Sequence, residues 1–189
     1  RALVDDRPAD GVFRVHKDAF RSQEIFDLEM VRIFEGGWVF VGMASEVPKP
    51  HDYLTTTIGR HPVVIMRDAT GKLGCFINRC RHRGAAICHL AKGNRRKHVC
   101  AYHGWTYDSA GKIWNLRDEK EGGYSPAFDS EDHNLARVPR FGEYRGFMSA
   151  SMNPDVLPLE EHLGDGRTLI DLVCDQAPSG QVELVPGRR

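Results

Sequence analysis

The chain has 189 residues, of which 41% are hydrophobic and 28% are charged, a composition typical of a folded globular protein rather than a disordered or fibrous one. Its 26 basic and 26 acidic residues balance, so no overall positive charge favours binding to nucleic acid or to an anionic membrane. No apolar run approaches the roughly 20 residues that a membrane-spanning helix needs, and the N-terminal region is too charged for a secretory signal, so we expect a cytoplasmic protein.

The first predicted element is a helix over residues 22–35. Ser22 can cap its start, acidic residues lie in its first turns, and apolar residues recur at intervals of three and four. Gly36 and Gly37 are expected to end it. We therefore assign residues 1–37 to an N-terminal helical segment.

From residue 38 the pattern changes to that of short strands. Turn sequences at 68–71 and 108–111 separate runs of alternating or β-branched residues. The expected strands cover residues 38–42, 52–58, 62–68, 72–78, 98–108, 112–116, 136–144 and 146–152. Short strands joined by turns predict a mainly β domain, a small antiparallel sandwich or barrel, over residues 38–153.

The pattern becomes helical again after residue 153. Pro158 stands at a plausible first helical position, and apolar residues continue to Val173 with an interruption at 164–166. Residues 181–187 then resemble a first strand without a partner. We assign residues 154–189 to a helical linker and the start of a truncated second domain.

Cysteine and histidine carry the chemical signal. The chain has five cysteines, an odd number without an export signal, which argues against a disulfide framework and for metal or cluster ligation. Cys80, His82, Cys100 and His103 form the pattern C-x-H-x17-C-x2-H, with one cysteine and one histidine on each of two hairpin loops. Such a set suits zinc, or a Rieske-type cluster in which two histidines replace two cysteines on one iron. Structural zinc sites usually have two cysteines close together in sequence and two histidines close together elsewhere. Here each loop has one cysteine and one histidine, which favours a cluster of two irons.

The segments CRHRGAAIC and CAYHGWTYDSAGK resemble the Rieske signature of the large (alpha) subunits of aromatic-ring-hydroxylating dioxygenases. The similarity extends to SQEIFDLEMVRIF, WVFVGMASEVP and SMNPDVLPLEEHLGD, and it is strongest for oxygenases of benzoate-like and anthranilate-like acids. It implies a Rieske [2Fe-2S] antiparallel β-sandwich with a cluster-binding subdomain, flanked by an N-terminal helix and a C-terminal helical segment. By this resemblance, Cys80 and Cys100 bind one iron, and His82 and His103 bind the other.

The resemblance also implies a function as the electron-entry part of a terminal oxygenase, an NADH-dependent oxidoreductase system. A reductase, a ferredoxin or both would reduce the cluster, and His103 would be the electron exit toward a mononuclear Fe(II). That iron would cis-dihydroxylate an aromatic substrate with O2. Family members are commonly homotrimers of large subunits, with or without a small beta subunit. The expected iron ligands, D-x2-H-x4-H, do not occur after Val185, so the chain alone should be inactive.

Two other classes stay open: a Rieske-type ferredoxin-like electron carrier without oxygenase activity, and a zinc-stabilised structural module. The leading helix and the trailing helical segment count against the carrier. Quinol-oxidising Rieske proteins have a further cysteine in each loop, and Ala85 and Tyr102 stand at those positions here. A serine that donates a hydrogen bond to the cluster in those proteins is replaced by Trp105, whereas Tyr107 remains as a donor to the cluster. Fewer hydrogen bonds to the cluster sulfurs stabilise the reduced cluster less, which predicts a reduction potential near the low end of the Rieske range, about −150 mV.

The remaining polar residues have structural interpretations. We expect buried thiols at Cys75, Cys88 and Cys174, and ordinary hairpin residues at His89 and His98. Trp105 and Tyr102 are expected to pack over and shield the cluster. We interpret the basic run Lys92, Arg95, Arg96 and Lys97 as a solvated turn, with docking of an acidic electron donor as the alternative.

Overall fold

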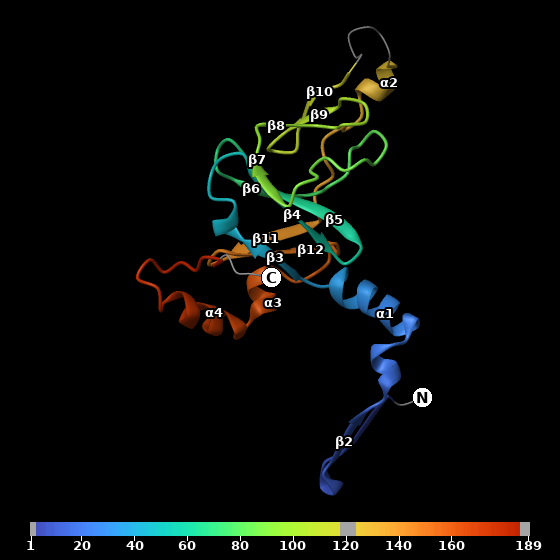
Figure 1. Cartoon of the computed structure of the whole chain (residues 1–189), viewed down its shortest axis with the longest axis vertical. Coiled ribbons are helices and arrows are strands. Elements are labelled where there is room, and N and C mark those ends of the chain that lie inside the picture. Colours follow the sequence, from blue (N-terminus) through green and yellow to red (C-terminus); the bar gives the residue numbers. More distant parts are fainter. Residues whose placement is uncertain (1–2, 118–123, 186–189) are drawn as a thin grey trace.

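The structure is a computed structural model that describes residues 3–117 and 124–185 (Figure 1). Short 3-10 turns lie at Pro8–Asp10, Lys17–Phe20 and Ala44–Glu46, and a π-helical turn at Met30–Phe34 continues the first helix. In chain order, the other elements are β1 (Val4–Arg7), β2 (Val12–Val15), α1 (Gln23–Glu29), β3 (Val39–Met43), β4 (Asp52–Ile58), β5 (His61–Arg67), β6 (Leu73–Ile77), β7 (Lys92–Asn94), β8 (Lys97–Val99), β9 (Thr106–Asp108), β10 (Ile113–Asn115), α2 (Pro126–Asp129), β11 (Arg140–Tyr144), β12 (Phe147–Ser151), α3 (Leu159–Leu163) and α4 (Gly166–Cys174).

The strands after α1 form three antiparallel sheets, with the orders β6-β5-β4-β7, β11-β12-β3 and β10-β9-β8. Figure 1 shows the β8–β10 sheet with α2 near the top of the view, the β4–β7 sheet in the middle and the β3, β11 and β12 sheet below it. This arrangement confirms the predicted mainly β, antiparallel fold.

Strand β5 is buried on both faces and divides the core in two. Val63 and Ile65 belong to a cluster shared with β3 and β12, while Val64 and Met66 belong to a second cluster with β9 and the two cysteine loops. Because side chains alternate along a strand, a continuous apolar run serves both cores at once. The cysteine loops are therefore packed directly on the central sheet.

The two flanking helical regions begin where the sequence predicts. The Ser22 hydroxyl accepts a hydrogen bond from the amide of Ile25 and caps α1. Pro158 precedes α3, and α4 follows the interruption at 164–166. The N-terminal hairpin and α1 extend away from the sheets in Figure 1. Within residues 3–117 and 124–185, no helix combines the length and apolar character needed to cross a bilayer.

Three local expectations were wrong or incomplete. Residues 4–15 form the β1–β2 hairpin, which the sequence analysis missed. The basic run is not simply a turn, since Lys92 lies in β7, Lys97 lies in β8 and only the residues between them connect these strands. Residues 181–185 are irregular instead of a strand, because they find no strand to pair with in the described structure, and residues 186 and 187 lie outside it.

Candidate metal centre

The two loops that carry the candidate ligands have the same backbone closure. The amide of Cys80 donates to the carbonyl of Ala85, and the amide of Gly84 donates to the carbonyl of Cys80, at 2.7 and 2.9 Å. Cys100 makes the matching bonds with Trp105 and Gly104, at 2.8 and 2.9 Å. Both glycines have φ near +75°, at 76° and 75°, a conformation that side chains disfavour. Each loop thus places its cysteine at the buried start and its histidine near the outer bend.

The cysteine pair is buried beneath the loops. Cys80 and Cys100 are 4% and 2% exposed, and burial raises the pKa of the Cys80 thiol. The Tyr107 hydroxyl lies 3.3 Å from Cys80 Sγ and accepts a hydrogen bond from the amide of Arg81 at 3.0 Å. Burial also raises the Tyr107 pKa, so this hydroxyl stays protonated. With Cys80 as a thiolate, the Tyr107 proton is left to donate to the sulfur, as the sequence analysis expected.

The histidine pair lies at the outer edge. His82 Nδ1 and His103 Nδ1 are 3.0 Å apart, and their rings meet edge to face. Two ring nitrogens at this distance require a proton or a metal ion between them, because their lone pairs otherwise repel. The stacked Trp105 ring partly removes His82 from water, and this desolvation, followed by electrostatic repulsion from His103 and Arg83, lowers the pKa of His82. A neutral imidazole is the form that binds metal.

These pairs fit a two-iron cluster. Within the described ranges, no three or more histidine, cysteine, aspartate or glutamate side chains form a group suited to one metal ion. The four candidate ligands instead form two pairs, Cys80 with Cys100 and His82 with His103. In a Rieske centre one iron takes two cysteines and the other takes two histidines. The donor set therefore fits that cluster, and which residues ligate it is taken up below as a proposal.

An aromatic layer covers the histidine pair. The buried ring of Trp105 stacks on His82 with centroids 5.0 Å apart, and it also makes edge contacts with Phe128 and His133. Tyr102 stacks on His103 at 4.1 Å but is 62% exposed. Trp105 therefore shields the site as predicted, whereas Tyr102 covers only one face of its histidine.

Sequence reasoning missed two supporting residues. The buried Asn78 side chain accepts hydrogen bonds from the amides of Ile87 and Cys88 and donates to the Cys88 carbonyl at 2.8 Å, which braces the first loop. The His133 ring donates from Nε2 to the carbonyl of Phe128 at 2.7 Å and holds the segment that covers Trp105. Neither residue belongs to a local motif, so only the tertiary structure reveals its role.

In the part of the chain that the structure describes, the other cysteines form no hydrogen bond with the ligand pairs. Cys75, Cys88 and Cys174 are buried free thiols, as predicted. Burial raises the pKa of Cys88 to about 12 and lowers that of His98 to about 4, so the contact between them, at 3.2 Å, joins two neutral groups.

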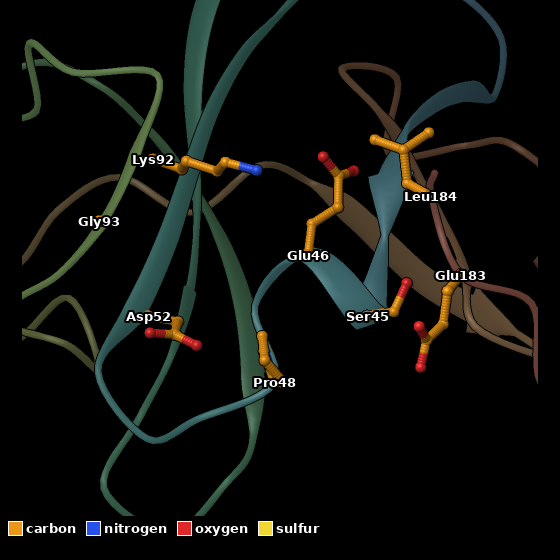
Figure 2. Close-up of a pocket in the computed structure, with 8 residues that line it drawn as sticks. All are labelled: Ser45, Glu46, Pro48, Asp52, Lys92, Gly93, Glu183 and Leu184. Carbon is orange, nitrogen blue, oxygen red and sulfur yellow. The ribbon is translucent and has the colours of Figure 1, made fainter. Parts of the chain in front are cut away.

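A pocket of about 380 Å³ lies on another part of the surface (Figure 2). Figure 2 shows Lys92 extending into this pocket from the side opposite Glu46. Glu183 and Leu184 from the C-terminal segment complete its wall. Since all four candidate ligands lie elsewhere, this pocket is separate from the metal centre.

Comparison with known proteins identifies related sequences. The family model described as "Rieske [2Fe-2S] domain" matches residues 37–139. The alpha subunit of toluate 1,2-dioxygenase from Pseudomonas putida is 43% identical over 187 residues, which are 98% of this chain and 41% of that protein. The large subunit of anthranilate 1,2-dioxygenase from Acinetobacter baylyi is 38% identical over 189 residues, 100% of this chain and 40% of that protein.

Solved structures give the same result. Naphthalene 1,2-dioxygenase from Rhodococcus sp. superposes with a TM-score of 0.81 at 32% identity, covering 92% of this chain and 39% of that one. A quaternary ammonium Rieske monooxygenase superposes with a TM-score of 0.74 at 28% identity, covering 84% and 43%. The chain thus spans about two fifths of the length of these relatives. The predicted resemblance and fold are confirmed.

Proposed function

The chain belongs to the Rieske [2Fe-2S] domain family, and on that premise we propose that it is the electron-entry portion of the alpha subunit of an aromatic-ring-hydroxylating dioxygenase. The observation that carries the proposal is that two matching loops bring their cysteines together as one pair and their histidines together as another. When bound, the cluster supplies one-electron transfer. We assign Cys80 and Cys100 to one iron and His82 and His103 to the other.

The surrounding residues prepare the site for that role. Tyr107 offers a proton to the Cys80 sulfur, and Trp105 holds the His82 ring and excludes water from one of its faces. The half-buried His103 is the proposed electron exit. It would face a mononuclear Fe(II) in a catalytic domain that continues from the linker at residues 154–189, in the same or a neighbouring subunit.

Relatives support the remaining assignments. A toluate and an anthranilate 1,2-dioxygenase are more similar in sequence than the quaternary ammonium monooxygenase, which favours cis-dihydroxylation of an aromatic acid. We propose an NADH-dependent reductase, a ferredoxin or both as the electron source, and a homotrimer with or without a small beta subunit. The free cysteines are consistent with a cytoplasmic location.

The first test is an absorption and EPR spectrum of the purified chain, oxidised and reduced with dithionite, with iron and acid-labile sulfide assayed. We expect two irons and two sulfides per chain and an anisotropic reduced signal. Cys100→Ala should lose the signal, whereas the matched control Cys75→Ala, which removes another buried thiol, should keep it. A colourless protein that binds one zinc would refute the cluster and the oxygenase assignment together.

The second test separates the oxygenase from the simple carrier. The full-length polypeptide, supplied with its reductase, NADH and benzoate, should consume O2 and release a cis-diol. Reduction of the cluster without product from any aromatic acid would favour the ferredoxin-like carrier.

A further inference from the structure

A broad groove of about 1120 Å³ lies outside the metal centre. Its walls come from the segment before β4, from the β5–β6 and β9–β10 turns, and from the end of the β7–β8 hairpin. All four candidate cluster ligands lie outside its lining. The groove has no part in the site described above.

Two turns of the same sequence pattern, D-x-x-G-K, contribute to the groove. Asp68 Oδ1 accepts a hydrogen bond from the amide of Lys72 at 2.9 Å, and Asp108 Oδ1 accepts one from the amide of Lys112 at 2.9 Å. Each carboxylate therefore faces the backbone of its own turn. The two lysines remain exposed at the rim.

The groove is strongly cationic. These two aspartates are its only acidic lining residues. Six exposed cations also line it, and none of them forms an ion pair with another described residue: Lys49, Lys72, Arg96, Lys97, Lys112 and Arg137. Trp114 is 61% exposed beside them, with Lys97 Nζ 3.9 Å from its ring centroid. An exposed tryptophan within a patch of one charge sign suits an interface with a protein of the opposite charge, whereas small-molecule sites are more enclosed and more apolar.

The groove and the candidate centre lie on opposite faces of strands β8 and β9. Lys97 and Asp108 pair across β8 and β9, and both line the groove. Tyr107, which precedes Asp108, points inward and contacts Cys80 Sγ at 3.3 Å. Because side chains alternate along a strand, the groove covers the outer face of β8 and β9, and their inner face contacts a ligand cysteine.

We propose that this groove is the docking surface for an acidic electron-donor protein. The inference rests on the proposed function, since only an electron-accepting centre needs such a donor. On docking, a reduced [2Fe-2S] protein loses one electron and this chain gains one, and no bond is made or broken. The unpaired cations would attract the donor before contact and raise the rate of association at low salt.

The test is stopped-flow reduction of the cluster-loaded chain by a reduced, acidic plant-type ferredoxin at about 20 mM and about 300 mM salt. Replacing Lys72, Lys97 and Lys112 by Glu should lower the second-order rate constant at least about tenfold at low salt and remove its salt dependence. The neutral Gln triple should give an intermediate rate. A matched control, in which Arg14, Lys17 and Arg21 are replaced by Glu, should stay within about twofold of the native rate.

Each other outcome contradicts the proposal in a distinct way. If the groove and control triples are slowed equally while both keep the native EPR spectrum, net charge explains the effect and the docking surface is wrong. If inorganic pyrophosphate binds the groove while the ferredoxin rate is unchanged, the groove is a small-anion site. If the native chain forms no cluster at all, the proposed function fails first and the docking proposal fails with it.

Discussion

Replacing Tyr107 by Phe should lower the reduction potential of the bound cluster. The hydroxyl lies 3.3 Å from Cys80 Sγ, and it already accepts from the Arg81 amide, so its proton is free for the sulfur. A hydrogen bond to a charged group contributes about 1.5–3 kcal/mol, and it is stronger in the reduced cluster, which carries one more negative charge. If this hydrogen bond is stronger by about 1 to 2 kcal/mol in the reduced than in the oxidised cluster, its loss lowers the reduction potential by about 40–90 mV, since about 59 mV corresponds to 1.4 kcal/mol for one electron.

The assay is a redox titration followed by EPR on Tyr107→Phe and on Tyr144→Phe. Tyr144 provides the matched control, because its hydroxyl contacts Asp171 at 3.0 Å rather than a candidate ligand. The control should keep the native potential. A Tyr107→Phe potential that rises, or that stays within about 10 mV of the native value, would refute the assignment of Tyr107 as a donor to the cluster.

Two stability predictions follow from local contacts. Hydrogen bonds from Arg60 lower the carboxyl pKa of Glu35 from 4.5 to about 2. Since the pKa is lower in the folded than in the unfolded protein, this stabilisation is complete above the unfolded pKa and is lost as the pH falls from 4.5 to about 2. Glu35→Gln should therefore remove about 1 kcal/mol from the pH dependence of the unfolding free energy, measured by denaturant titration. An unchanged pH profile would contradict this. Gly111 and Gly71 occupy equivalent turns with φ of 75° and 90°, but an added methyl would overlap the Phe76 ring only at Gly111. By urea denaturation, Gly111→Ala should therefore cost about 2–4 kcal/mol and Gly71→Ala about 1–2 kcal/mol, and equal losses would show that the Phe76 contact is not decisive.

The parts of the molecule governed by local sequence were predictable. Ser22 caps α1 through its own hydroxyl, and the β4, β5 and β6 strands follow from β-branched runs between turn residues. The four candidate ligands were also accessible to sequence reasoning, because ligand chemistry demands particular residue types at particular spacings. In each case the interactions that decide the outcome lie within a few residues, or concern residues whose chemistry is distinctive.

Features that depend on distant partners were not predictable. A segment around His133 folds over Trp105, about thirty residues away in sequence, and no local pattern indicates this contact. Strand β7 exists because Lys92, Gly93 and Asn94 pair with β4, although glycine and asparagine disfavour strands. The cationic groove likewise combines two turns that each resemble an ordinary hairpin connection. All three features depend on tertiary contacts that local sequence does not report.

The two ligand types differ in burial, and this difference bears on how the centre works. Burial of the Cys80 thiol raises its pKa, so its thiolate is unfavourable until a cation neutralises it, and cluster binding must be coupled to loss of that proton. His82 is exposed, and its lowered pKa keeps the ring neutral and ready to bind at neutral pH. The cysteine side is therefore the part that needs the metal's charge and is closed to solvent. The histidine side is the open edge, where an electron acceptor can approach.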